Sequence, residues 1–318
     1  MKYQNVINYV NSEPWAILPE KLDAILGLLE MRAAGLTFTA AEIRDRIGPQ
    51  TEASEELELL AVAGARRRLR GRPEAIGVLR VHGTIANRMN MMTETSGGTS
   101  VERLRKGFRS AIANPDIGSV ILDIDSPGGA TGGIEELAAE IREARAVKPI
   151  VAVVDSLAAS AAFWLASGAN EIVASPSSHV GSVGVLAVHT DSTAKKEADG
   201  VKTSIISAGK FKAELDGELT SDAEAHMQSL VDDRFEAFVS DLAAGRGVSM
   251  KTVRSDFGQG RIFPAKRALA AGMVDRVDTM QATIERLAGG KAVRRRPMAA
   301  TVEERNLVAA RLELLDVG

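Results

Sequence analysis

The sequence predicts an α/β domain in which a mainly parallel sheet is flanked by helices. From Ala75 onward, short apolar segments rich in valine and isoleucine alternate with amphipathic helical segments, a pattern typical of parallel strands joined by crossover helices. These apolar segments are nearly continuous, as expected for strands that are covered on both faces. Residues 1–74 differ, because their apolar residues recur at helical spacing. We therefore predict a helical N-terminal extension in front of the α/β domain.

The expected elements of the α/β domain follow in chain order. Strands are predicted at 76–81, 120–124, 150–154 and 171–174. Helices are predicted at 101–112, 134–144, 158–166, 221–244 and near 281–287. In the N-terminal extension, Leu22 and Leu29 belong to one apolar helical face, and Thr39 with Glu42 has the form of a capping box that opens a second helix.

Two basic stretches divide the chain into three regions. Residues 1–74 form the helical adaptor region with a basic linker, residues 75–288 the α/β domain, and residues 289–318 a second basic linker with a short helix. The arginines of 66–72 and 294–296 lie next to glycine and proline, which is typical of exposed linkers. Contact with nucleic acid is the alternative interpretation of these stretches.

Composition excludes several classes of function. The 39 Lys and Arg residues against 42 Asp and Glu residues give a net charge of −3, so we expect no general attraction to nucleic acid or anionic membranes. The absence of cysteine rules out disulfides, thiolate metal ligands and a cysteine nucleophile. The first residues lack the basic start and apolar core of a signal peptide, and no apolar run reaches the ~18 residues that span a bilayer. We therefore expect a cytoplasmic protein without a membrane anchor.

One serine stands among small side chains at a predicted junction between a strand and a helix. Ser160 lies within Asp155-Ser156-Leu157-Ala158-Ala159-Ser160-Ala161-Ala162-Phe163-Trp164. A serine hydroxyl is almost never ionised near neutral pH, so it needs a neighbouring base before it can attack a carbonyl. Ser160 is therefore the candidate nucleophile, and the identity of the base decides the mechanism.

Lys212 is the candidate base. Its loop combines small residues with Phe211, an aromatic group that could shield an amine from water. A lysine acts as a base only when its pKa falls well below the ordinary value of ~10.4, and burial away from carboxylates supplies such a shift. Lys210 is the competing choice in the same loop. Of the four histidines, His82 and His226 are better explained as structural or surface residues.

The turn Ser126-Pro127-Gly128-Gly129 is a candidate oxyanion hole. A tetrahedral oxyanion needs two backbone N–H donors at ~3 Å, and glycine lets the backbone approach without an obstructing Cβ. The amide of Gly128 is the first choice of donor, with Gly129 beside it and Ala161, after the nucleophile, as the second. The alternatives are an ordinary turn and a phosphate-binding loop, although the glycines lack the Gly-Lys-Ser/Thr ending of such a loop.

A further serine lies in Gly181-Ser182-Val183-Gly184, which lacks the G-x-S-x-G spacing of a nucleophile elbow. The segment is better explained as a turn and strand that line the cleft. Because extended peptides commonly add to strand edges by backbone pairing, we take Gly181, Ser182 and Val183 as candidate substrate-binding residues.

These motifs together resemble those of the signal peptide peptidase A family, the serine peptidases of family S49, over about residues 75–288. The phage-type branch, the minor capsid protein C-like head maturation proteases, is the most similar, because a region containing Pro14-Trp15-Ala16-Ile17-Leu18-Pro19 stands in place of a membrane anchor. The motifs occur in the order Ser126-Pro127-Gly128-Gly129, Asp155-Ser156-x-Ala158-Ala159-Ser160-Ala161-Ala162, Ser175-Pro176-x-Ser178-x-Val180-Gly181-Ser182-Val183-Gly184 and Gly209-x-Phe211-Lys212.

The resemblance implies a Ser-Lys dyad of Ser160 and Lys212, with Gly128 in the oxyanion hole. It also implies a Clp-protease/crotonase-like fold, assembly into homo-oligomeric rings, and peptide-bond hydrolysis without a metal or other cofactor in the S49 peptidase domain. The Clp branch of this fold uses Ser-His-Asp instead. His179 lies near the turn where that branch places its histidine but comes a few positions too early, so the Ser-Lys dyad is favoured.

The expected function is a serine endopeptidase that processes capsid, scaffold or portal-associated proteins of a phage or prophage, with itself as a candidate substrate. Its place is then the cytoplasm of the bacterial host or the virion. A scaffold protein that keeps the fold with little turnover and a general cytoplasmic peptide-degrading peptidase are the alternatives. Acyl-thioester chemistry, as in crotonases, would leave the Ser160–Lys212 pair without a purpose. Because only a short segment follows Leu287, we do not expect a long scaffold region.

Overall fold

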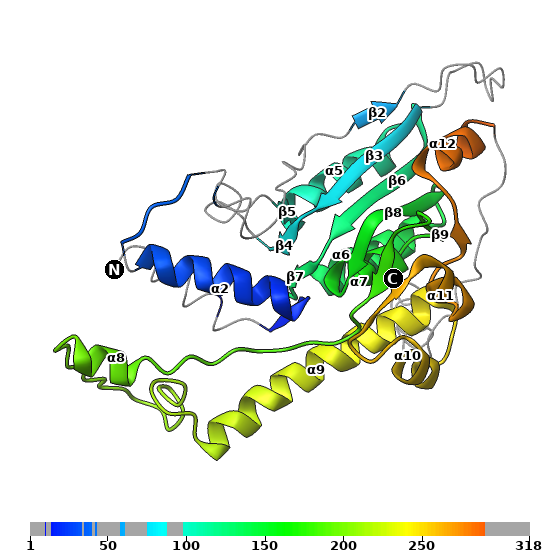
Figure 1. Ribbon diagram of the computed structural model, residues 1–318. Helices are drawn as coiled ribbons and strands as arrows, with labels where there is room; N and C mark the ends of the chain where they lie inside the picture. The colour runs from blue at the N-terminus through cyan, green and yellow to red at the C-terminus, as the bar shows by residue number, and fades with distance from the viewer. Residues whose placement is uncertain are drawn as a thin grey trace, which may run out of the picture.

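The computed structural model describes residues 10, 14–33, 35–39, 42, 58–60, 75–87 and 98–289 (Figure 1). The basic stretches 66–72 and 294–296 and the C-terminal helix predicted after them lie outside these residues. Within the described ranges, no helix is both long enough and apolar enough to cross a membrane.

A mainly parallel sheet forms the centre of the molecule. Its strands are β2 (Glu58–Leu60), β3 (Ala75–His82), β6 (Ile117–Ser126), β8 (Ile150–Ala159), β9 (Glu171–Ala174), β10 (His179–Gly181), β11 (Ile262–Pro264) and β12 (Arg276–Val277). The order is β11-β10-β8-β6-β3-β2, and β9 lies between β8 and β12. Among these described strands, only β2 and β11 pair antiparallel with their neighbours. The predicted fold class, a mainly parallel sheet flanked by helices, is confirmed.

Strand β8 has two partners along the same edge. Its first residues pair with β9, and its last residues, Leu157–Ala159, pair with β10. On its other edge β8 pairs with β6, with a register irregularity near the carboxyl end. The carboxyl ends of β6 and β8 therefore lie side by side, which is where ligand sites form in parallel sheets.

A second, smaller sheet lies at this carboxyl end. It has the order β1-β7-β4-β5, with β1 (Trp15–Ile17), β4 (Thr84–Ala86), β5 (Gly98–Ser100) and β7 (Gly128–Ala130). Strand β7 follows β6 after one proline, and β1 pairs antiparallel with β7. The N-terminal region was predicted to be helical, and its helix α2 (Pro19–Ala33) is present, but the segment before that helix is a strand of the α/β body.

Helices cover both faces of the main sheet (Figure 1). Helices α5 (Val101–Ala113), α6 (Ile134–Ala144), α7 (Ala161–Ser167) and the end of α9 (Ser221–Arg246) share the larger apolar cluster with one face. Helix α12 (Met280–Ala288) packs on the other face. The other described helices are α8 (Thr193–Ala198), α10 (Met250–Asp256) and α11 (Ala265–Ala270).

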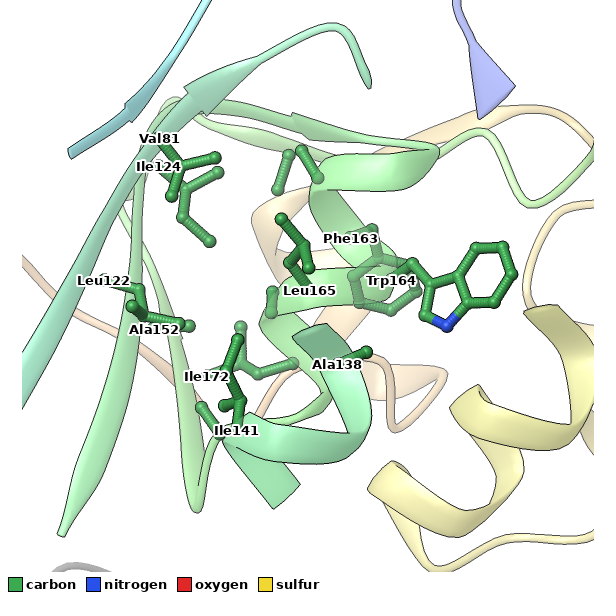
Figure 2. Close-up of a cluster of buried hydrophobic side chains, with 14 of the residues drawn as sticks. Val81, Leu122, Ile124, Ala138, Ile141, Ala152, Phe163, Trp164, Leu165 and Ile172 are labelled. Atoms are coloured by element: carbon green, nitrogen blue, oxygen red, sulfur yellow. The ribbon is translucent and has the colours of Figure 1, made fainter. Parts of the chain in front are cut away.

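Helix α7 is enclosed in the larger core (Figure 2). All of its residues are buried, which suits a helix that is apolar on every side. Its Trp164 stacks on Phe238 of α9 with ring centroids 4.6 Å apart. The Trp164 indole also donates a hydrogen bond of 2.8 Å to Asp241. These contacts hold α7, and the residue that precedes it, in a fixed position.

A buried ion pair attaches the end of α9 to the main sheet. Arg246 lies 2.8 Å from Asp275, and the two side chains are 0% and 2% exposed. The same guanidinium donates to the carbonyl of Gly272, and Asp275 accepts from the amide of Ile172 in β9. The pair is thus satisfied on both sides by backbone groups.

The structure corrects one predicted boundary next to the candidate nucleophile. The helix predicted at 158–166 begins only at Ala161, because β8 continues through Ala159. Alanine favours helices, but here Ala158 and Ala159 pair with Val180 and Gly181 of β10. Long-range strand pairing therefore overrides the local preference of the alanines.

Candidate active site

Ser160 occupies a strained turn between β8 and α7. Its backbone has φ 56° and ψ −119°, which is a rare conformation for a residue with a side chain. Its amide donates to the carbonyl of Gly181 at 2.7 Å, and its carbonyl accepts from the amide of Trp164 at 2.9 Å. The strained turn is thus held from both the strand side and the helix side.

The hydroxyl of Ser160 contacts a backbone carbonyl. It is directed at the carbonyl of Gly184, with an Oγ-to-oxygen distance of 3.3 Å, and the residue is 0% exposed. A backbone carbonyl accepts a hydrogen bond but does not remove the proton. The described state of Ser160 is therefore buried and not activated.

Gly128 lies directly against Ser160. A Cβ on Gly128 would lie 3.0 Å from the Ser160 Cβ and 2.2 Å from the carbonyl oxygen of Ala16, and φ is +96°. Only glycine fits this position without strain. The amide of Gly128 donates to Ser126 Oγ at 3.2 Å, so in this state it is engaged within its own turn.

Gly129, the other predicted member of the turn, is fixed by packing between strands. Its β-strand partners are Ala16 of β1 on one side and Ile85 of β4 on the other. A Cβ at Gly129 would lie 1.8 Å from the Ile85 carbonyl oxygen. Ala161, the predicted second donor, is buried as the first residue of α7 and so directly follows the candidate nucleophile.

Replacing Gly128 by alanine tests its predicted role as an oxyanion donor. Losing one such donor usually costs about 10²–10³-fold in rate, and we expect a fall of that size in the turnover of a peptide substrate. The added Cβ cannot occupy the space beside Ser160 without moving the turn. The measurement is kcat/KM on a fluorogenic peptide. Gly272→Ala is the matched control, because Gly272 also has positive φ but no atom within 4 Å of its Cβ position. If Gly128→Ala turned over peptide at the wild-type rate, the predicted oxyanion role of this turn would be wrong.

The predicted substrate-binding residues surround Ser160 from the β10 side. The Gly181 carbonyl accepts the hydrogen bond from the Ser160 amide. Ser182 has φ 55°, and its amide donates to the Arg261 carbonyl at 2.9 Å. Val183 is buried in the larger core. Gly184, whose carbonyl faces the Ser160 hydroxyl, was not among the predicted site residues. The sequence could have indicated Gly184, because it lies two residues after Ser182 in the same motif.

Lys212 is not brought to Ser160 within one chain. It is an exposed residue of the segment between α8 and α9, which lies at the far end of an arm, away from α7 (Figure 1). Phe211, expected to shield an amine, is itself 54% exposed, and the Lys210 ammonium lies 4.5 Å from its ring centroid. The arm thus carries both candidate lysines on its surface.

The arm also exposes apolar side chains. Only the final turns of helix α9, which include Phe238 and Leu242, pack on the body, while Leu230 is 43% exposed. The large apolar residues exposed on the arm are Val201, Ile205, Ile206, Phe211, Leu215 and Leu230. Monomeric proteins seldom leave such a group uncovered.

Strand β1 is a component of the site that the sequence reasoning missed. Its three residues pair with Gly128–Ala130, the strand that carries the glycine turn. On the other edge, Trp15 and Leu186 exchange two backbone hydrogen bonds of 2.7 and 2.9 Å. The available signal was an apolar tetrapeptide that precedes Pro19, because a residue before proline favours extended backbone.

An acidic group lies on the opposite face of the sheet from α7. Asp125 of β6 is half-buried, and its neighbour Ile124 faces the larger core, so the two side chains point to opposite faces. Burial raises the pKa of the Asp125 carboxyl above its ordinary value; His82 opposes this rise and Asp155 adds to it. The Ser160 hydroxyl faces the carbonyl of Gly184 and not one of these carboxylates.

Residues 142–294 match the family model described as Peptidase family S49. This range contains Ser160 and Lys212. A protein described as Capsid assembly protease C of Escherichia phage lambda is 28% identical over 264 residues, which are 77% of this chain and 59% of the relative. Head-tail preconnector protein GP5 of Enterobacteria phage P21 is 30% identical over 253 residues, 77% of this chain and 49% of the relative.

The chain thus spans about half the length of these curated relatives. Among solved structures, a mutant of the 1510-N membrane-bound stomatin-specific protease matches 65% of this chain and 82% of its own, with 16% identity and a TM-score of 0.42. The resemblance predicted from the motifs is confirmed, because residues 142–294 match the model of Peptidase family S49 and the similar proteins include two from phages.

Proposed function

We propose that this chain is a serine endopeptidase in which Ser160 is the nucleophile and Lys212 the general base. The observation that carries the proposal is the strained turn at Ser160 beside Gly128. Strained backbone at a strand-to-helix junction, next to a glycine amide, is the arrangement that a nucleophile and an oxyanion donor need. The amides of Gly128 and Ala161 are the proposed donors.

In the proposed reaction, the neutral amine of Lys212 takes the hydroxyl proton while Ser160 Oγ bonds to the scissile carbonyl carbon. The negative charge on the carbonyl oxygen is stabilised by the two amides. The lysine ammonium then gives its proton to the leaving amine as the C–N bond breaks, which leaves an acyl-enzyme. Water, deprotonated by the same amine, hydrolyses this ester and regenerates Ser160.

We propose that the two members of the dyad meet between copies of the chain in a homo-oligomeric ring. Three observations support this: Lys212 is exposed on an arm that extends from its own body, Phe211 beside it is exposed, and the arm carries uncovered apolar residues. Docking of the arm on the next copy would cover these side chains. Burial also favours the neutral form of an amine, which the base must have.

The test is complementation between two inactive variants. Ser160→Ala and Lys212→Ala should each be inactive alone, because each lacks one member of the dyad. After equal amounts are mixed, dissociated and reassembled, random pairing should restore about a quarter of the wild-type sites. The measurement is hydrolysis of a fluorogenic peptide per chain, together with fluorophosphonate labelling of the Lys212→Ala subunits.

Lys210→Ala is the control for position in the loop and should remain active. If the mixture stays inactive, the dyad does not form between copies. If Lys212→Ala is itself active and Lys210→Ala or His179→Ala is not, the role of base passes to that residue.

The proposed substrates are capsid, scaffold or portal-associated proteins, and the chain itself. The support is the nature of the relatives, which are described as a capsid assembly protease and a head-tail preconnector protein of two phages. On this proposal the chain acts in the cytoplasm of a bacterial host or within the assembling virion.

A further inference from the structure

Strand β1 lies between strand β7 and the segment at Leu186. We call the space between these two edges the slot, and it lies beside the candidate nucleophile Ser160. One edge is β7, which pairs antiparallel with β1 from Trp15 to Ile17. This pairing extends beyond the strand, because Thr131 donates to Pro14 and Leu18 donates to Pro127. The other edge is Leu186, through two backbone hydrogen bonds with Trp15. β1, which is remote in sequence, thus fills the space between strand β7 and the segment at Leu186 as an added strand does.

The slot lies directly beside Ser160. The carbonyl oxygen of Ala16 is 2.2 Å from the Cβ position of Gly128, and that position is 3.0 Å from the Ser160 Cβ. The segment that forms the second edge begins at Gly184, whose carbonyl faces the Ser160 hydroxyl. An extended peptide in this slot therefore passes both the nucleophile and the glycine turn. Ser160 is 0% exposed with β1 in place.

The side chains of β1 alternate between two apolar clusters. Ala16 belongs to the larger core that contains Ala158 and Ala161, and thus faces the nucleophile side. Trp15 and Ile17 belong to a separate cluster with α2, and the Trp15 indole donates to the carbonyl of Val10 at 2.9 Å. The slot therefore holds a small side chain toward Ser160 and large apolar side chains away from it.

From this arrangement we infer that β1 occupies the peptide-binding slot of the proposed peptidase and inhibits it from within the same chain. The inference rests on the proposed function. A substrate must displace β1, pair with β7 and the segment at Leu186 in the same extended form, and place a small residue where Ala16 lies. Main-chain pairing supplies the affinity, and the small space beside Ser160 supplies the selectivity.

The backbone contacts explain why β1 stays intact. The Gly128 amide donates to Ser126, the Ser160 hydroxyl faces Gly184, and Ala16 is paired with Gly129. The proposed oxyanion donor Gly128 is thus engaged with its own turn instead of with a carbonyl of β1. The strand occupies the slot without presenting a bond for attack, as an inhibitor does.

A reversible covalent lock tests this inference. The chain has no cysteine, so the variant Trp15→Cys/Ala130→Cys holds a single pair. The two positions face each other across the antiparallel pair and share one apolar cluster, as disulfide geometry requires. The oxidised protein should react with a fluorophosphonate probe at Ser160, and hydrolyse peptides, at least about tenfold more slowly than the reduced protein, since only the fraction with an open slot can react.

The single variants Trp15→Cys and Ala130→Cys, carried through the same oxidation and reduction, are the controls and should show no such dependence. Equal rates for the oxidised and reduced double variant, with the disulfide verified by mass, would overturn the inference and leave the proposed peptidase standing.

A second measurement needs no catalysis, so it decides the inference even if the proposed function fails. Hydrogen exchange is followed in full-length Ser160→Ala with an added capped peptide of the sequence of residues 12–19. The peptide should displace β1, so the amides of Trp15 and Leu18 should lose protection, whereas a scrambled peptide should leave them protected. Unchanged protection at saturating peptide would show that β1 is a permanent strand and would overturn the inference.

Discussion

Replacing Ser160 by alanine should abolish peptide hydrolysis, with a fall in kcat of roughly 10⁴–10⁶-fold, the range found when a serine nucleophile is removed. Alanine keeps the Cβ and loses only the hydroxyl, whose hydrogen bond is to the Gly184 carbonyl. The fold should therefore be retained. The measurement is kcat on a fluorogenic peptide, together with loss of fluorophosphonate labelling.

Ser178→Ala is the matched control for this variant. Ser178 is also a fully buried serine near the site, but its hydroxyl donates to the carbonyl of Ser175 within a turn. It should keep its turnover. A Ser160→Ala protein that hydrolyses peptides at the wild-type rate would show that another group is the nucleophile.

The second large effect concerns stability. Replacing Arg246 by methionine should lower the free energy of unfolding by roughly 3–5 kcal/mol, because it leaves the Asp275 carboxylate buried without its cation. The side chains of both residues are almost fully buried, so water cannot replace the lost guanidinium. The Gly272 carbonyl also loses its two hydrogen bonds from Arg246. The measurement is the midpoint of chemical denaturation and its slope.

Arg254→Met provides the contrast. Arg254 pairs with Glu236, and both side chains are exposed, so its loss should leave the midpoint essentially unchanged. The double variant Arg246→Met/Asp275→Leu should recover part of the lost stability, since it removes the buried charge as well. If Arg246→Met unfolds at the wild-type midpoint, the ion pair does not hold α9 to the sheet.

The main sheet could be predicted because local patterns encode its strands and helices. Helix α6 and strand β9 begin and end at the predicted residues. Strand β8 could not be followed to its end, because Ala158 and Ala159 are held extended by long-range pairing with β10 and, at Ala158, with Ser126 of β6. Strand β1 was missed because its partners, β7 and Leu186, lie far from it in the sequence.

The residues of the candidate site also differ in how far local sequence patterns could predict their positions. Ser160 and Gly128 each follow the end of a strand in a parallel sheet, where sites gather, and the structure places the two residues side by side. Lys212 lies on an arm whose position no local pattern determines. Phe211 and Ile206 are exposed there, so the arm makes few of the contacts that would relate its position to the sequence pattern of the body.

The pairing of β1 also sets an order of events during folding. Trp15 leaves the ribosome early, whereas β7 and Leu186, its two partners, are made only after the first strands of the main sheet. Pairing over such a separation closes a long loop and comes late. We therefore expect the space between β7 and Leu186, beside Ser160, to stand open for an interval in the newly folded body before β1 pairs.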